Sequence, residues 1–171
     1  MDLRVNKTKK AIINSFILLR ANKPVEKITI KELTDMAEIN KATFYRHYED
    51  IYALSESLEQ ELIAGCLNKF SDPAHLFDNN GVANLSNAFS SQGELFNIIF
   101  SGNRINVAVE KIHDGLMEKY LLCHPELQNN KKEKMLLSAL IYGGFYSYLK
   151  YQDEDYDVIV DSLSKLSELL Q

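Results

Sequence analysis

Cationic, hydroxyl-bearing and aromatic side chains gather in the eight residues from Lys41 to Tyr48. Lys41 and Arg46 can neutralise phosphates, and an arginine can also donate two hydrogen bonds to O6 and N7 of guanine. The hydroxyls of Thr43 and Tyr45 suit phosphate oxygens, a contact that fixes register without reading sequence. These residue types therefore indicate chemistry directed at DNA.

Such side chains act together only if a helix presents them on one face. Asn40 can cap a helix over residues 41–48, in which Phe44 and Tyr48, four residues apart, point into the protein. Ala42 is small, so the helix backbone can approach a DNA groove closely. The side chains then predicted to face DNA are Lys41, Ala42, Thr43, Tyr45, Arg46 and His47.

A second short helix begins just before this one. Thr29 and Glu32 have the spacing of a capping box, in which each side chain accepts a hydrogen bond from the other residue's backbone N–H. The residues predicted to face inward are Leu33, Met36 and Ala37. The helix N-terminus, with Thr29 and Lys31, is predicted to hold a phosphate. Two short helices joined by a tight turn over residues 29–48 predict a helix-turn-helix, whose second helix enters the major groove.

Composition favours helices, and the charge is unevenly distributed. Seven glycines and three prolines in 171 residues are few for a turn-rich β protein. Residues 1–50 hold ten Lys/Arg against seven Asp/Glu, a balance of +3, whereas residues 51–171 hold nine against seventeen, a balance of −8, which together give −5. A basic head on an acidic body suits a protein that presents one end to phosphate.

Helical periodicity predicts an all-α chain of nine helices with no strand. The breakers Asp72-Pro73 and Asn79-Asn80-Gly81 interrupt it. The helices are expected at about 7–21, from 29, 41–48, 51–70, 82–91, 94–101, 103–124, 130–152 and 156–170.

Residues 6–60 resemble the DNA-binding head of the tetracycline-repressor (TetR) family. The matching residues are Thr29-Ile30, Leu33, Ala37, Ile39-Asn40-Lys41, Thr43-Phe44-Tyr45-Arg46-His47-Tyr48 and Ala53-Leu54. The resemblance implies a DNA-binding domain over 1–50 and a regulatory and dimerisation domain over 51–171. It also implies an Ω-shaped homodimer that binds a palindromic operator, usually as a repressor released by a small molecule.

Two positions depart from the family pattern. Glu38 replaces the usual turn glycine, and a left-handed conformation there costs a residue with a side chain about 1 kcal/mol or more, so a different turn geometry is expected. Ile51, next to Glu49 and Asp50, replaces a lysine that commonly holds a phosphate. Either the affinity for DNA is lower, or residues such as Lys9 and Lys10 compensate as DNA contacts.

Two helices of the body carry candidate dimer contacts. Ile159, Leu163, Leu166 and Leu170 form an apolar stripe, which packs either on its own body or on a partner. Gly143-Gly144 lies within a helix that is apolar nearly all round. Glycines in mid-helix are explained either by close approach of another backbone, such as a partner's at a two-fold axis, or by a kink. The predicted interface is completed by Leu140 and Ser147.

The remaining predictions concern ligands and chemistry. A small-molecule pocket is expected among the body helices, although a plain core explains the same residues: Phe70, Phe96, Phe100, Tyr142, Phe145 and Tyr146. His75, His113, Cys123 and His124 lack metal-ligand spacing. With no catalytic or cofactor motif and no export signal, we expect no enzyme, no cofactor, no metal, no membrane and a cytoplasmic location with reduced thiols. The alternatives to a DNA-binding regulator are a coactivator or interaction protein of the same fold and an all-α ligand carrier or enzyme.

Overall fold

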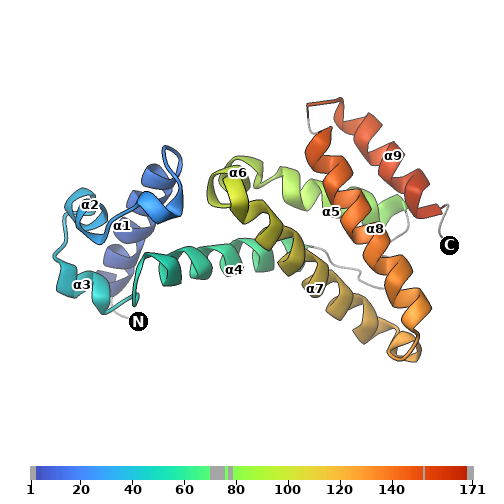
Figure 1. The fold of residues 1–171 in the computed structure, drawn as a ribbon, viewed down its shortest axis with the longest axis horizontal. Helices are drawn as coiled ribbons and strands as arrows, with labels where there is room; N and C mark the ends of the chain where they lie inside the picture. Colours follow the sequence, from blue (N-terminus) through green and yellow to red (C-terminus); the bar gives the residue numbers. More distant parts are fainter. Residues whose placement is uncertain (1–2, 70–75, 77–78, 152, 169–171) are drawn as a thin grey trace. The chain divides into compact units, whose positions relative to one another are not determined.

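The computed structural model describes residues 3–69, 76, 79–151 and 153–168, and these form nine α-helices and no strand (Figure 1). The prediction of an all-α chain is therefore confirmed for the described residues. The helices are α1 (Leu3–Arg20), α2 (Ile30–Met36), α3 (Lys41–Tyr45), α4 (Ile51–Lys69), α5 (Asn79–Ser90), α6 (Gly93–Ile99), α7 (Ile105–Cys123), α8 (Lys131–Lys150) and α9 (Tyr156–Glu168). Short 3-10 turns are η1 (Val25–Lys27), η3 (Gly102–Arg104) and η4 (Pro125–Leu127).

The chain divides into two compact units. Unit 1 comprises Met1–Leu62 and Glu94–Ile105, and unit 2 comprises Ile63–Gly93 and Asn106–Gln171. Unit 1 thus contains the first part of α4 and most of α6, besides the segment up to residue 50 that was predicted as a domain. The division does not coincide with the boundary predicted at residue 50.

Local capping signals place the short helices as expected. The backbone N–H of Glu32 donates to the Thr29 hydroxyl (3.2 Å), and the N–H of Thr43 donates to Asn40 Oδ1 (2.8 Å). The N–H of Ala53 likewise donates to Asp50 Oδ1 (2.7 Å). Each cap satisfies an N–H group that a helix start leaves unpaired.

Two expectations about local structure are wrong. Residues 79–81 begin α5 rather than breaking the chain, because Asn and Gly are tolerated at a helix start, where few backbone hydrogen bonds are required. Met36 is 46% exposed instead of facing inward, whereas Leu33 and Ala37, four residues apart, share the buried face of α2.

The turn between α2 and α3 does contain the left-handed residue. Glu38 has φ 53°, the backbone N–H of Ile39 donates to the Thr34 carbonyl (3.0 Å), and that of Glu38 donates to the Asp35 carbonyl (3.3 Å). These two bonds form a Schellman motif, which ends a helix with a left-handed residue. The expectation of a different turn geometry is therefore wrong, because carbonyl pairing at the end of α2 outweighs the strain at Glu38.

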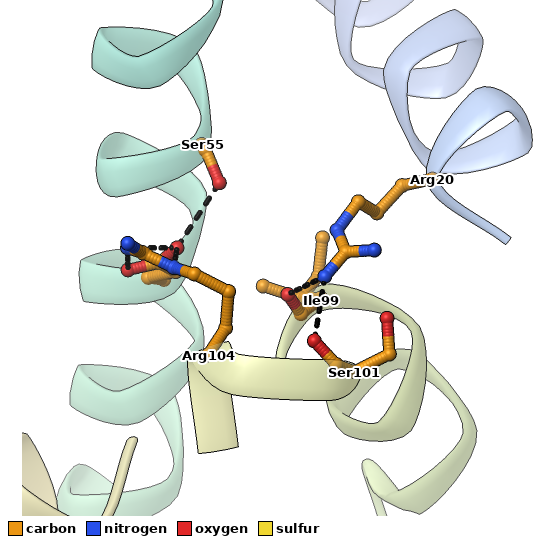
Figure 2. Close-up of polar contacts among 6 residues, drawn as sticks. Arg20, Ser55, Ile99, Ser101 and Arg104 are labelled. Atoms are coloured by element: carbon orange, nitrogen blue, oxygen red, sulfur yellow. Dashed lines mark hydrogen bonds and ion pairs between the residues drawn. The ribbon is translucent and has the colours of Figure 1, made fainter. Parts of the chain in front are cut away.

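A buried ion pair joins α4 to η3 within unit 1. Glu59 is completely buried, and both of its carboxylate oxygens accept from Arg104 (2.5–3.0 Å). The hydroxyl of Ser55, one turn earlier, donates to the same carboxylate (3.0 Å) (Figure 2). A buried carboxylate requires such partners, since its hydration is lost.

Arg20 makes a second connection within unit 1. This residue at the end of α1 is 4% exposed, and it donates to the carbonyls of Ile99 (3.4 Å) and Ser101 (2.9 Å) (Figure 2). It also donates to the carbonyl of Lys23 (3.2 Å). Ile99 ends α6, whose last carbonyls lack helical partners and carry the negative end of the helix dipole. Burial lowers the pKa of the Arg20 guanidinium. A cation thus links α1 to the end of α6.

Replacement of Glu59 by glutamine is expected to lower the free energy of unfolding by about 3 kcal/mol, because Arg104 loses its carboxylate. Urea titration followed by circular dichroism measures the change. The control is Glu56→Gln on the exposed side of α4, for which we expect a change within about 0.5 kcal/mol. Equal effects of the two substitutions would show that the buried pair has no special weight.

Replacement of Glu38 by glycine is expected to raise the free energy of unfolding by about 1 kcal/mol, because glycine adopts positive φ without steric cost. The matched control is Glu56→Gly in mid-helix, which should lower it by about 1 kcal/mol. Thermal and urea denaturation of both variants measure the two signs. A destabilised Glu38→Gly variant would contradict the role assigned to this turn.

Candidate nucleic-acid interface

The exposed face of α3 presents the side chains that the sequence predicts for DNA contact. Phe44 is fully buried, while Lys41, Ala42, Arg46 and Tyr45 are exposed. The Tyr45 ring, 56% exposed, stands edge-on against Phe44 with centroids 5.7 Å apart. One aromatic residue in the core therefore orients a second one outward. Geometrically, α3 and the turn that follows it can offer two cations, Lys41 and Arg46, and the Tyr45 phenol to one ligand surface.

The end of α3 differs from the prediction. The α-helix ends at Tyr45, and Arg46 and His47 continue as a turn, with the N–H of His47 donating to the Phe44 carbonyl (2.8 Å). His47 and Tyr48 are half-buried. The Tyr48 ring lies 6.1 Å from that of Phe44, and burial raises the pKa of its phenol. Tyr48 thus covers the inner side, as predicted.

Thr43 has a structural role in this segment. Its hydroxyl donates to Asn40 Oδ1 (2.9 Å), the same atom that accepts from the Thr43 backbone N–H. A hydroxyl has one proton to donate. Because the cap uses that proton, Thr43 can only accept from a further partner unless the cap rearranges. It is therefore a weaker candidate for phosphate binding than Tyr45.

The other predicted contacts have different surroundings. Thr29, Lys31 and Lys10 are exposed. Lys9, in contrast, pairs with Glu61 of α4 (3.2 Å), and this hydrogen bond raises the pKa of the Lys9 ammonium. An exposed pair of this kind is weak, so Lys9 can exchange Glu61 for a phosphate at little cost.

The start of α4 cannot supply the phosphate contact common in the resembling family. Ile51 is buried (5% exposed), and the Asp50 carboxylate occupies the helix N-terminus. Glu32, which a capping box would direct to the Thr29 N–H, pairs with Lys23. Carboxylates of the chain thus already occupy two places where an anion could bind, the N-terminus of α4 and the Lys23 ammonium.

The five described residues among the six predicted to line a pocket do not come together. Phe96 and Phe100 are buried against each other in unit 1, with ring centroids 4.7 Å apart. In unit 2, Tyr142 and Tyr146 donate to Glu110 (2.9 Å) and to Asn106 (3.2 Å). These two tyrosines lie at the α7–α8 surface, and Phe70 falls outside the described residues.

Phe145 is the exception, since it lines an apolar cavity of about 90 Å³ in unit 2. Its ring meets that of Phe89 edge-on at 6.1 Å. The walls of this partly open cavity come from α5, α7, α8 and α9, together with Leu76. A cavity bordered by α9 was not foreseen, because periodicity shows which face of a helix is apolar but not what covers it.

The residues predicted for a dimer interface fall into three environments. Leu140 and Gly144 line the cavity, Leu163 and Leu166 line both the cavity and a neighbouring groove, and Ser147 and Ile159 line that groove alone. The groove, of about 360 Å³, lies between the end of α8 and α9. Gly143 faces open space, and Leu170 falls outside the described residues. Within the chain, α9 packs on α5 and α8, so the part of the apolar stripe that is described contributes to its own body.

The closest glycine contact lies elsewhere. A Cβ at Gly143 would meet nothing within 4 Å, and one at Gly144 would meet only Leu163 Cδ2, at 3.8 Å. At Gly115 of α7, however, a Cβ would lie 2.4 Å from Leu67 Cδ1 of α4. Gly115, and not the Gly143-Gly144 pair, therefore marks the tight helix packing within the chain.

Glu59, Arg104 and Arg20 were missed by sequence reasoning. The available signal was a glutamate that follows Leu58 on an otherwise apolar side of α4, with Ser55 one turn before it. A charge at such a position predicts a buried partner. Its identity was not accessible, because Arg104 lies 45 residues away in sequence.

The described residues give no indication of a metal centre or a membrane span. No group of three or more His, Cys, Asp and Glu side chains in the described part of the chain could hold a metal ion. No described helix is both long and apolar enough to cross a bilayer. Cys66 is buried, and burial raises the pKa of its thiol.

Comparison of the chain with protein-family models and with curated proteins finds no match. Function must therefore be inferred from the residues and their geometry.

Proposed function

We propose that this protein is a DNA-binding transcriptional regulator of the tetracycline-repressor type, which inserts α3 into the major groove. The observation that carries the proposal is the two-sided character of α3, with Phe44 fully buried and Lys41, Ala42, Tyr45 and Arg46 exposed. A recognition helix needs this division, because one side must be fixed in the protein while the other reaches base edges and phosphates.

The surroundings of α3 support the same function. Exposed Lys10 and Lys31 add cations in unit 1, and residues 1–50 carry a balance of +3. Positive charge on this segment favours DNA by releasing counterions. The Schellman turn at Glu38 fixes α2 relative to α3, so the exposed face has one defined orientation.

In this proposal the protein acts as a repressor, in the cytoplasm, as a homodimer on a palindromic operator. The groove between α8 and α9 and the open space at Gly143 are where the partner copy docks. Two-fold symmetry of the protein then matches that of the operator. A small-molecule effector would act by preferring one spacing of the two heads, which weakens DNA binding by its differential affinity.

Replacement of Arg46 by alanine is expected to weaken binding to the operator by about ten- to a hundredfold and to reduce the salt dependence by about one counterion. The duplex is first selected by the purified protein from a random library, and affinity is measured by gel retardation over a series of salt concentrations. Tyr45→Ala should weaken binding as well.

The control is Lys132→Ala at the start of α8, which removes an exposed cation from unit 2. It should leave DNA affinity unchanged. Failure of the folded protein to select any duplex at low salt would refute the proposal and favour the interaction protein, as would equal binding by Arg46→Ala and the parent chain.

The proposed dimer is tested by Gly143→Arg. A side chain at this position meets nothing in the single chain, so the fold should survive while a desolvated arginine in the interface disrupts pairing. Analytical ultracentrifugation should show dimers for the parent chain and monomers for the variant. The control Glu126→Arg, exposed in η4, should remain dimeric. A dimeric Gly143→Arg variant would exclude this face of α8.

A further inference from the structure

The cavity of unit 2 is lined almost entirely by hydrocarbon. Ile112 and Leu116 of α7, Leu140 and Phe145 of α8 and the α9 leucines form most of its wall, and none of the described residues that line it carries a charge. Its polar lining side chains are Ser86 and Tyr148. The Tyr148 hydroxyl already contacts that of Ser90 (3.2 Å).

This uncharged lining favours an uncharged ligand. An ion in the cavity would lose its hydration without gaining a counter-charge, which is strongly unfavourable. Water is also poorly served, because it needs two to four polar partners to be stable in such a site. A neutral apolar molecule gains dispersion contacts with the apolar wall and leaves no polar group of its own unpaired.

The volume of the cavity indicates the size of ligand that fits it. The cavity measures about 90 Å³. An apolar cavity of about 150 Å³ lined by Leu, Ile and Phe binds benzene or xenon and stays dry otherwise. A molecule of about one aromatic ring therefore suits this cavity, with small adjustments of the leucine side chains.

The position of α9 gives occupancy of the cavity a consequence. Leu163 and Leu166 line the cavity and also the groove between α8 and α9. Tyr148 of α8 borders both spaces as well. A molecule bound in the cavity contacts these shared side chains. Because close-packed side chains transmit displacement to their neighbours, its binding must also alter the shape of the groove.

We propose that this cavity binds a small, uncharged apolar molecule of about one ring and that its occupancy fixes α9 against α5, α7 and α8. The inference that this molecule is an effector of DNA binding rests on the proposed function, whereas the inference that the cavity binds it does not. The site differs from the pocket expected from the sequence, since only Phe145 of the five described candidate residues lines it.

The test uses benzene as the probe and benzoate as its charged analogue, with the full chain. Benzene should raise the melting temperature saturably and slow amide hydrogen exchange in α9, whereas benzoate should do neither. Gly144→Met sends a flexible side chain into the cavity, because a Cβ at Gly144 meets only Leu163 Cδ2. It should weaken benzene binding, measured by calorimetry, by about tenfold or more.

The control variant is Gly65→Met on the exposed side of α4 in unit 2, where a Cβ also meets nothing within 4 Å, and it should leave benzene binding unchanged. A second pair guards against misfolding: Leu163→Phe fills the cavity from α9, and Asp161→Phe changes an exposed position of the same helix that borders neither the cavity nor the groove. Binding that is absent in the folded parent chain, equal for benzoate, or unaffected by both filling variants would overturn the proposal.

Gel retardation on the same samples separates the two proposals. A chain that binds its selected duplex but not benzene retains the proposed function and refutes the cavity site. A chain that binds benzene but no duplex retains the cavity site and refutes the DNA-binding function. If both bind, a change in DNA affinity on adding benzene identifies the site as regulatory, and unchanged affinity refutes its role as an effector site.

Discussion

Unit 1 depends on a carboxylate that has no contact with water. Glu59 is completely buried, and its charge is tolerated because Arg104 and Ser55 donate to it. Removing either the charge or its partners leaves an ion without compensation, a cost of about 3–5 kcal/mol. The first part of α4 and η3 must therefore stay together. Arg20, held by carbonyls at the end of α6, extends the same constraint to α1. These two arginines explain why Glu94–Ile105 belongs to one compact unit with the N-terminal helices.

The short helices of this unit could not stand alone, since isolated helices of five to seven residues are not stable in water. Their stability comes from caps, from the Schellman turn at Glu38 and from the burial of Leu33 and Phe44. The outward face of α3 and the turn after it is exposed, so packing does not constrain which residues occupy it. That Lys41, Tyr45 and Arg46 occupy it is therefore informative about function in a way that Phe44 is not. The left-handed Glu38 fits the same logic, because a strained residue persists where the surrounding bonds determine its conformation.

Sequence reasoning succeeded where the determining interactions are local. The caps by Thr29, Asn40 and Asp50 depend on residues three positions apart, so spacing alone predicted them. It failed where the partner is distant. The apolar stripe of α9 was recognised, but whether α5, α8 or a second chain covers it is not encoded in its period. The aromatic residues chosen for a pocket were assigned by type, and Phe96 and Phe100 turned out to belong to a different unit from Phe145. The tight packing at Gly115 was missed for the same reason, since Gly115 and Gly143 look alike until the neighbouring helix is known.

Two sets of residues in the C-terminal helices could contribute to contact with a partner: the leucines of the α9 stripe and the exposed residues that border the groove. Leu163 and Leu166 contribute to the cavity, so they are partly committed within the chain and offer a partner less new burial than their sequence period suggests. Tyr151 and Val158, which border the groove, remain 51% and 57% exposed and thus retain most of their apolar surface. Because association is favoured by apolar area that a partner removes from water, a partner docked here would draw more on these residues than on the leucine stripe. Aromatic residues are frequent hot spots of interfaces, which places Tyr151 ahead of the leucines. The stripe that first indicated an interface would then shape the groove, while its exposed border supplies the contact.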